Sequence, residues 1–299
     1  MAQATADLTG KLCMITGATS GIGKAAALAL ARLGSSLVLV ARDRARGKRT
    51  LEEIVQKTGN RQVELMLADF SSQQQIRQLA RNFLAKERPL HILFNNAGVV
   101  MLRREETVDG IETTFAVNHL GYFLLTRLLL ERIQASAPSR IVSTASDAYG
   151  YAGGRLDFED LQSQKRYSTM NVYGKSKLAN ILFTQELARS LEGTGVTANC
   201  FHPGLVGSNF ARNNGPLASI GMLLIRPFIR SVKKGAETGV HLCASPAVEG
   251  VTGGYFFNKG ERRLKAYARN EEDARRLWNI SERMTGLRPA SKNVASGFA

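Results

Sequence analysis

The sequence KLCMITGATSGIGKAAALALARLG, residues 11–34, joins a short apolar run to an alanine-rich run through a turn that contains three glycines. The apolar run is typical of a buried strand, and the alanine-rich run is typical of a helix. Gly17 permits a tight turn after the strand, while Gly21 and Gly23 let the backbone approach a pyrophosphate and the helix pack on the sheet. An ordinary glycine-rich turn is the alternative, but its place at the first strand–helix junction favours a phosphate-binding turn.

The same alternation of short apolar runs and helical patterns continues along the chain. Strands are predicted at residues 11–16, 35–42, 62–70, 90–96, 140–146, 196–203 and 253–258. Helical patterns occupy residues 23–34, 43–57, 71–86, 110–134, 171–191 and 235–246. Most of the strands are apolar on both faces, as expected in a covered parallel sheet. We therefore predict an α/β fold, a single-domain Rossmann-type doubly wound parallel sheet of about seven strands with helices on both faces.

Length and composition fit one domain. The chain has 299 residues, 44% of them hydrophobic, and contains no linker or repeat. We assign residues 1–299 to one domain, with a core at about 8–287 and a polar tail at 288–299. The first residues show no basic segment followed by a long apolar run, and no run of about 18 apolar residues exists, so neither a signal peptide nor a transmembrane segment is expected. Cys13, Cys200 and Cys243 have no paired or metal-type spacing, which predicts buried reduced thiols in a cytoplasmic protein.

The formal net charge of +15 favours anionic partners in general. Basic clusters occur at residues 42–49, 226–234 and 262–276, without interleaved aromatic residues or zinc-finger spacing. We therefore expect no nucleic-acid partner, and one basic cluster is expected to bind a phosphate. The four histidines have no ligand spacing, so no metal site is expected.

Three motifs follow predicted strands, where a doubly wound sheet binds its ligands. They are T-G-x-x-x-G-x-G at 16–23, NNAG at 95–98 and Y-x-x-x-K at 173–177. In this order and placement the chain resembles a short-chain dehydrogenase/reductase over residues 8–287. The resemblance implies contacts with a nicotinamide dinucleotide at Gly17, Thr19, Ser20, Gly21, Ile22, Gly23, Arg42, Asp69, Phe70, Asn95, Ala97, Gly98, Tyr173, Lys177, Pro203, Gly204, Val206 and Ser208. For Asp69, a role in starting the next helix is the alternative.

The residues after the second predicted strand bear on the choice of nucleotide. An acidic residue there binds the ribose 2′-hydroxyl of NAD, whereas an arginine accommodates the 2′-phosphate of NADP. By resemblance the acidic position is Ala41 and the basic one is Arg42, with Arg46 or Lys48 assisting. This pattern favours NADP(H) over NAD(H), although Asp43 is placed where it could face the ribose instead.

The resemblance assigns catalytic roles to Asn118, Ser146, Tyr173 and Lys177. A carbonyl that receives hydride needs a proton donor and a stabilised oxygen. Tyr173 and Lys177 share one helix face, so the ammonium is expected to lower the pKa of the phenol. Ser146 would hydrogen-bond the substrate oxygen, with Ser143 and Thr144 as alternatives, and Asn118 would hold a water near the lysine.

The segment at 209–234 follows the sixth predicted strand, where this fold usually has its substrate lid, so we predict a lid there. Its apolar residues indicate a lipophilic pocket, a partner or a membrane contact, with basic residues at the rim, and a plain packed helix is the alternative. The insert at 147–172 and the segment LWNISERMTGL resemble the retinol-dehydrogenase-like branch of the family. The resemblance implies a lipophilic aldehyde or ketone and its alcohol as the substrate pair, with peripheral membrane contact and a homodimer or homotetramer as expected partners. A non-catalytic nucleotide-sensing protein with the same fold is the alternative.

Overall fold

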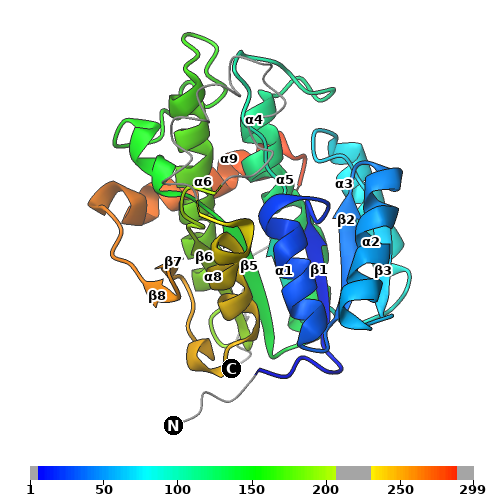
Figure 1. Cartoon of the computed structure of the whole chain (residues 1–299). Coiled ribbons are helices and arrows are strands. Elements are labelled where there is room, and N and C mark those ends of the chain that lie inside the picture. Colours follow the sequence, from blue (N-terminus) through cyan, green and yellow to red (C-terminus); the bar gives the residue numbers. More distant parts are fainter. Residues whose placement is uncertain (1–5, 207–229, 288–299) are drawn as a thin grey trace, which may run out of the picture.

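A computed structural model describes residues 6–206 and 230–287 of the chain. Its eight strands form one sheet in the order β3-β2-β1-β4-β5-β6-β7-β8 (Figure 1). They are β1 (Leu12–Thr16), β2 (Ser36–Ala41), β3 (Val63–Leu67), β4 (Ile92–Asn95), β5 (Ser139–Thr144), β6 (Val196–Phe201), β7 (Tyr255–Phe257) and β8 (Gly260–Glu261). The first seven are parallel and correspond to the seven predicted strands. This confirms the doubly wound sheet. The unpredicted β8 has only two exposed residues and pairs antiparallel with β7.

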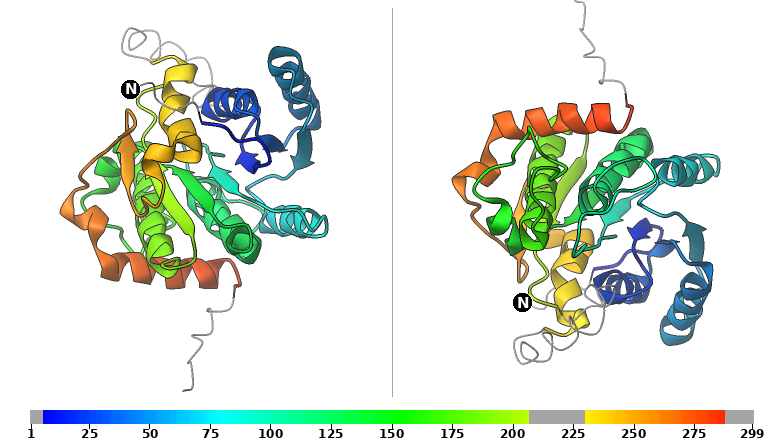
Figure 2. Two further views of the ribbon diagram at one scale, coloured as in Figure 1. Left: turned by 90° about the horizontal axis from the view of Figure 1, so that it is seen from below. Right: turned by 90° about the horizontal axis from the view of Figure 1, so that it is seen from above.

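Helices cover both faces of the sheet. Figure 2 shows α1 (Gly21–Arg32), α2 (Arg44–Thr58) and α8 (Val232–Ala244) on one face. On the other face lie α3 (Gln73–Leu84), α5 (Gly121–Gln134) and α6 (Thr169–Ser190). Two buried apolar clusters, one under each helical layer, enclose the sheet. The order reverses between β1 and β4, so the carboxyl ends of these strands lie at the point where such sheets bind ligands.

The helical region predicted at 110–134 is interrupted. A short α4 (Thr113–Phe115) leads into a π-turn, η1 (Ala116–Leu120), and α5 begins at Gly121. A side chain at Gly121 would place its Cβ 2.7 Å from the Phe70 ring, so the helix and the residue after β3 need a glycine for their close approach. Phe70 is buried in the core, and its predicted contact with the cofactor stays a prediction.

The sequence patterns missed helix α9 (Glu271–Met284), which packs against α6 (Figure 2). Its first turn is acidic and Asn270 caps it by accepting from the Asp273 N–H at 2.9 Å. The insert after β5 begins with a 3-10 helix, η2 (Asp147–Ala152), and is joined to α9 by the Arg155–Asp273 ion pair at 2.9 Å. The insert is therefore folded against the domain.

Residues 209–229 of the predicted lid, together with Ser208 and the predicted tail at 288–299, lie outside the described residues. Residues 230–234 of the predicted lid are among the described residues. Arg230 forms a β-bridge with Val206, and the first turn of α8 contains Lys233 and Lys234. Helix α8 therefore starts three residues before the helical pattern recognised in the sequence.

Candidate functional site

Tyr173 and Lys177 lie in the second and third turns of α6, beside the carboxyl end of β5. The Lys177 Nζ is 5.4 Å from the centre of the Tyr173 ring and donates to the main-chain oxygen of Thr144 at 3.0 Å. Lys177 is only 2% exposed, and burial lowers its pKa from 10.5 to about 7. The geometry thus brings the two side chains together as their spacing predicts.

The Tyr173 phenol has a pKa opposite to the sequence-based expectation. Burial raises this pKa from 10.0 to about 12, while a hydrogen bond with Ser146 opposes the rise. The net shift is therefore upward, against the expected lowering, because burial of the phenol is the largest cause. Tyr173 is consequently a protonated phenol at neutral pH.

Among the three hydroxyl candidates, Ser146 is the one that contacts Tyr173. It has an extended backbone, caps η2 and accepts from the Ala148 N–H at 3.1 Å. Ser143 lies buried within β5, and the Thr144 hydroxyl is buried and directed to Asn96 Oδ1 at 3.5 Å. The geometry favours Ser146 over both alternatives.

Asn118 lies in the π-turn, and its side chain makes three hydrogen bonds. Its Oδ1 accepts from the Val99 N–H at 2.8 Å, and its Nδ2 donates to the Val99 carbonyl at 3.0 Å and to Ser176 Oγ at 3.1 Å. These contacts join the loop after β4 to α6. The predicted role of Asn118 in holding a water near Lys177 stays a prediction.

The glycine turn between β1 and α1 is closely packed. A Cβ at Gly17, whose φ is +66°, would lie 2.8 Å from the Ala97 Cα, and one at Gly23 would lie 2.4 Å from the Gly17 oxygen. Ser20 precedes α1 but makes no side-chain cap, so it leaves the first-turn N–H groups of this helix uncapped. These N–H groups include that of Ile22 and lie next to Thr19. They could donate to the phosphates of a dinucleotide.

Asn96 is a site residue that sequence reasoning missed. Its side chain donates to the Thr16 carbonyl at 3.0 Å, and Thr16 Oγ1 accepts from the N–H groups of Asn96 and Ala97 at 2.8 and 3.0 Å. The predicted Asn95 instead points into the core and donates to Thr126 Oγ1 at 3.0 Å. Successive side chains of a strand point to opposite faces. The adjacent positions of Asn95 and Asn96 in the NNAG motif could therefore have predicted that only one of them faces the core.

The charged residues after β2 and β3 differ in whether their side chains are already bonded within the protein. Arg42 is exposed, whereas the Asp43 carboxylate caps α2 by accepting from the Arg46 N–H at 2.7 Å. No acidic side chain of the described residues pairs with Arg42 or Arg46. Asp69 turns back on its own loop, where it accepts from the N–H and hydroxyl of Ser71 at 2.9 and 2.8 Å.

The turn after β6 contains Pro203, Gly204 and Val206. Gly204 has a φ of +84°, and a Cβ there would lie 2.6 Å from Arg230 Cδ. Val206 packs against Gly235 at the start of α8, where a Cβ would come within 2.5 Å of it. This turn is therefore held between β6 and α8 at the same edge of the sheet as Gly98 and Ser146.

Comparison with known proteins agrees with this geometry. The family described as short chain dehydrogenase matches residues 11–216. Retinol dehydrogenase 12 of Mus musculus is 46% identical over 281 residues, which cover 94% of this chain and 88% of that protein. Retinol dehydrogenase 11 of Homo sapiens is 44% identical over 283 residues, which cover 95% and 88% of the two chains.

The chain is a short-chain dehydrogenase. Among solved structures, an uncharacterised protein from Mycobacterium paratuberculosis has a TM-score of 0.77 and 28% identity over 95% of this chain and 97% of that one. The RhlG–NADP complex of Pseudomonas aeruginosa has a TM-score of 0.66 and 25% identity over 84% and 95%. The family and its retinol-dehydrogenase-like relatives make this short-chain dehydrogenase an oxidoreductase that uses NAD(P) to interconvert alcohols and carbonyl compounds.

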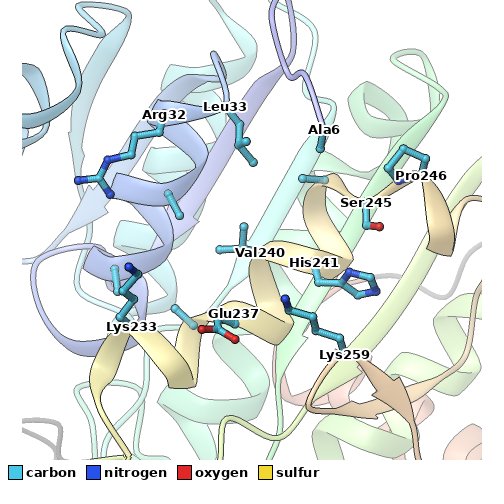
Figure 3. A pocket seen from close by; sticks show the side chains of 14 residues that line it. Ala6, Arg32, Leu33, Lys233, Glu237, Val240, His241, Ser245, Pro246 and Lys259 are labelled. Atoms are coloured by element: carbon cyan, nitrogen blue, oxygen red, sulfur yellow. The ribbon is translucent and has the colours of Figure 1, made fainter. Parts of the chain in front are cut away.

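A separate hollow of about 260 Å³ lies between α1 and α8 (Figure 3). Its lining includes Arg32 of α1 and Lys233, Glu237 and His241 of α8, but none of the dehydrogenase's site residues. The hollow is therefore distinct from the catalytic edge. In the described part of the chain, no group of three or more His, Cys, Asp or Glu residues is placed to hold a metal ion. None of the helices in that part is both long and apolar enough to cross a membrane.

Proposed function

We propose that the protein uses NADP(H) to interconvert a lipophilic aldehyde or ketone and its alcohol, with Tyr173 as the acid and base. The observation that carries the proposal is the convergence of Tyr173, Ser146 and Lys177 at the edge where the glycine turn also lies. When bound, the nicotinamide supplies or accepts the hydride. The uncapped start of α1 and the turn at Pro203–Val206 would hold the two ends of that cofactor.

Each side chain has a distinct task in this proposal. Tyr173 is protonated at neutral pH, so it can donate to a carbonyl oxygen as hydride arrives. Ser146 shares a hydrogen bond with the phenol and stabilises the same oxygen. Lys177, held by the Thr144 carbonyl, is the cation that favours a phenolate when the reaction runs towards oxidation. Asn118 would hold a water beside it, as the family resemblance implies.

The proposal for NADP(H) over NAD(H) rests on the end of β2. Arg42 is exposed and available for a 2′-phosphate, and Asp43 uses its carboxylate to cap α2. The NADP complexes of similar proteins from Pseudomonas aeruginosa and Burkholderia cenocepacia are consistent with this choice. Arg42→Ala is expected to raise the Michaelis constant for NADPH roughly tenfold to a hundredfold and that for NADH far less, since it removes one charge-assisted contact. Equal changes for both nucleotides would overturn the preference.

A lipophilic substrate is supported by exposed apolar side chains around the start of α6. Leu102, Tyr151 and Met170 are 52%, 61% and 46% exposed. The segments that carry Leu102 and Tyr151 both bond to the start of α6, since the Leu102 carbonyl accepts from Thr169 and the Tyr151 carbonyl accepts from Asn171. Apolar surface of this kind fits apolar substrates, as do relatives named retinol dehydrogenases. The same surface supports peripheral membrane contact as part of the proposal, which binding to anionic vesicles would test.

A cytoplasmic location is supported by the three cysteines, which are free and buried. Helix α6 has little exposed apolar surface with which to form a homodimer or homotetramer. Four apolar residues on the length of α6 are fully buried within the chain: Leu178, Ile181, Leu182 and Leu187. Helix α9 also covers part of α6. A subunit contact would therefore need another surface, and light scattering of the purified protein would test its presence.

The deciding experiment compares wild type with Tyr173→Phe. The wild type is expected to consume NADPH with a panel of lipophilic aldehydes and ketones. The variant is expected to bind NADPH equally well, because the phenol does not hold the phosphates, but to lose at least about 100-fold in kcat. Binding of NADPH by the wild type without turnover of any substrate would favour the nucleotide-sensing alternative. Turnover by the variant would remove Tyr173 from its role.

A further inference from the structure

A polar cluster outside the catalytic residues surrounds the carboxylate of Asp147, which directly follows Ser146. Asp147 Oδ1 accepts from the Tyr255 hydroxyl at 2.6 Å. Asp147 Oδ2 lies 3.3 Å from His202 Nε2 and 3.4 Å from Arg262 Nη1. The three partners come from β7, from the end of β6 and from the segment after β8. One carboxylate therefore joins three segments behind the catalytic edge.

His202 makes a second contact with the same residue. Its Nδ1 lies 3.3 Å from the main-chain nitrogen of Asp147, whose N–H donates to it. An imidazole nitrogen can accept only when it carries no hydrogen, so these partners assign the neutral tautomer with its hydrogen on Nε2. That hydrogen then faces the Asp147 carboxylate. The ring is also fixed by stacking on Phe257, with centroids 5.0 Å apart and planes inclined by 23°.

The Asp147–His202 contact links the segment with the proposed substrate-binding serine to the turn proposed to hold the nicotinamide end of the cofactor. Asp147 follows Ser146, the proposed partner of the substrate oxygen, and His202 precedes Pro203, in the turn proposed to hold the nicotinamide end of the cofactor. We infer that neutral His202, clamped between the N–H and carboxylate of Asp147, is a positioning residue that holds Ser146 and the Pro203–Gly204 turn in register. This inference rests on the proposed function, because Ser146 matters only if it contacts the reacting oxygen.

The clamp depends on the charge of the imidazole. Protonation of Nδ1 would replace the acceptor by a donor and break the bond from the Asp147 N–H. The charged groups around His202 are Asp147 on η2, Arg230 before α8 and Arg262 after β8, while Tyr255 on β7 remains protonated because burial raises its pKa. Burial is the largest effect on His202 and lowers its pKa from 6.5, with Arg262 and Arg230 acting in the same direction against Asp147. Neutral His202 is therefore the form present at neutral pH, and an acid limb is expected below pH 6.5.

Two variants separate the clamp from bulk packing. His202→Asn keeps an acceptor near the Nδ1 position but does not titrate, whereas His202→Phe keeps a flat ring on Phe257 without an acceptor. At pH 7.5, His202→Phe is expected to lower kcat by about 10- to 100-fold through misplacement of Ser146, and His202→Asn by less than about fivefold. His202→Asn is also expected to remove the acid limb of kcat. His241→Asn, on α8 beside the separate hollow, should change neither quantity.

The test uses the full chain with NADPH and the best aldehyde or ketone of the panel. Hydrogen exchange of the peptides at 146–152 and 202–206 provides a readout that does not need turnover. Faster exchange in both peptides of His202→Phe, with near wild-type exchange in His202→Asn, supports the clamp. Wild-type kcat and exchange in His202→Phe, or an unchanged acid limb in His202→Asn, would overturn it. An inactive wild type would instead contradict the proposed function, and the exchange measurement would still decide the clamp.

Discussion

Replacing Lys177 by methionine is expected to stabilise the fold while it removes activity. The ammonium is 2% exposed, and its contacts in the described structure are the Thr144 carbonyl and the rings of Tyr122 and Tyr173. No carboxylate of the described residues pairs with it, so the charge is held in the interior at a cost. Methionine has a similar length and no charge, and its flexible thioether fits irregular interior space.

The size of the effect follows from the pKa. Burial moves the pKa of Lys177 from 10.5 to about 7, and each unit corresponds to about 1.4 kcal/mol, so the charged form costs roughly 5 kcal/mol. The lost hydrogen bond to the Thr144 carbonyl offsets about 1–3 kcal/mol of the gain. Lys177→Met is therefore expected to raise the free energy of unfolding by about 2–4 kcal/mol at pH 6.

The stability gained by Lys177→Met is expected to fall as the pH rises, because it comes from removing a buried charge. Below about pH 7 both the folded and the unfolded chain carry the Lys177 proton, and the whole cost is present. Between about pH 7 and 10.5 the unfolded chain retains the proton while the folded chain releases it, so the cost shrinks as the pH rises. The advantage of the methionine variant should thus be largest at pH 6 and nearly absent at pH 10.

Urea unfolding without nucleotide, at pH 6 and pH 10, measures this difference. Lys175→Met is the matched control, because Lys175 lies on the same helix, is 8% exposed and donates to the Asp160 carbonyl and Ser163 hydroxyl at 3.3 and 3.4 Å. The control should be destabilised at both pH values and should remain active. A Lys177→Met protein that is less stable than wild type at pH 6, or equally shifted at both pH values, would refute the reasoning.

Three further outcomes are expected. Gly23→Ala should weaken NADPH binding at least about tenfold by calorimetry, because its Cβ would lie 2.4 Å from the Gly17 oxygen, whereas Gly150→Ala, with 4.0 Å of space, should change little. Glu282→Gln should lower the free energy of unfolding by about 3–5 kcal/mol in urea titrations, because it leaves the largely buried Arg127 without its charged partner; an unchanged midpoint would contradict this. The value of kcat/KM for carbonyl reduction should fall above about pH 7, where free Lys177 loses its proton, and a flat profile to pH 9 would speak against the lysine's role.

Local patterns were sufficient to predict the sheet. The seven apolar runs and the glycine turn are each specified by neighbouring residues, and the strand–helix alternation leaves few topologies. The proximity of Tyr173 and Lys177 was predictable for the same reason, since residues four apart share a helix face. Helix α9 was missed because its charged residues dominate the pattern, while its apolar side chains Leu277 and Trp278 face α6 and α5.

Side-chain roles that depend on distant contacts were not predictable. Asn118 reads as an interior asparagine, yet its partners are Val99 and Ser176, 19 and 58 residues away. The pKa of Tyr173 depends on how much protein surrounds the phenol, which no spacing reveals. The Asp147–His202 contact joins residues 55 apart. In each case the residue type was visible but its partner was supplied by the tertiary fold.

The loop after β4 is bonded to β1 on one side and to the π-turn on the other. On one side Thr16 Oγ1 accepts from the N–H groups of Asn96 and Ala97, and on the other Asn118 binds both main-chain groups of Val99. The loop therefore lies fixed between the glycine turn and the catalytic helix before any ligand arrives. Because little backbone remains to be ordered on binding, more of the contact energy with the cofactor appears as affinity. Asn118→Ala should thus weaken NADPH binding as well as turnover, whereas Ser146→Ala should affect turnover alone.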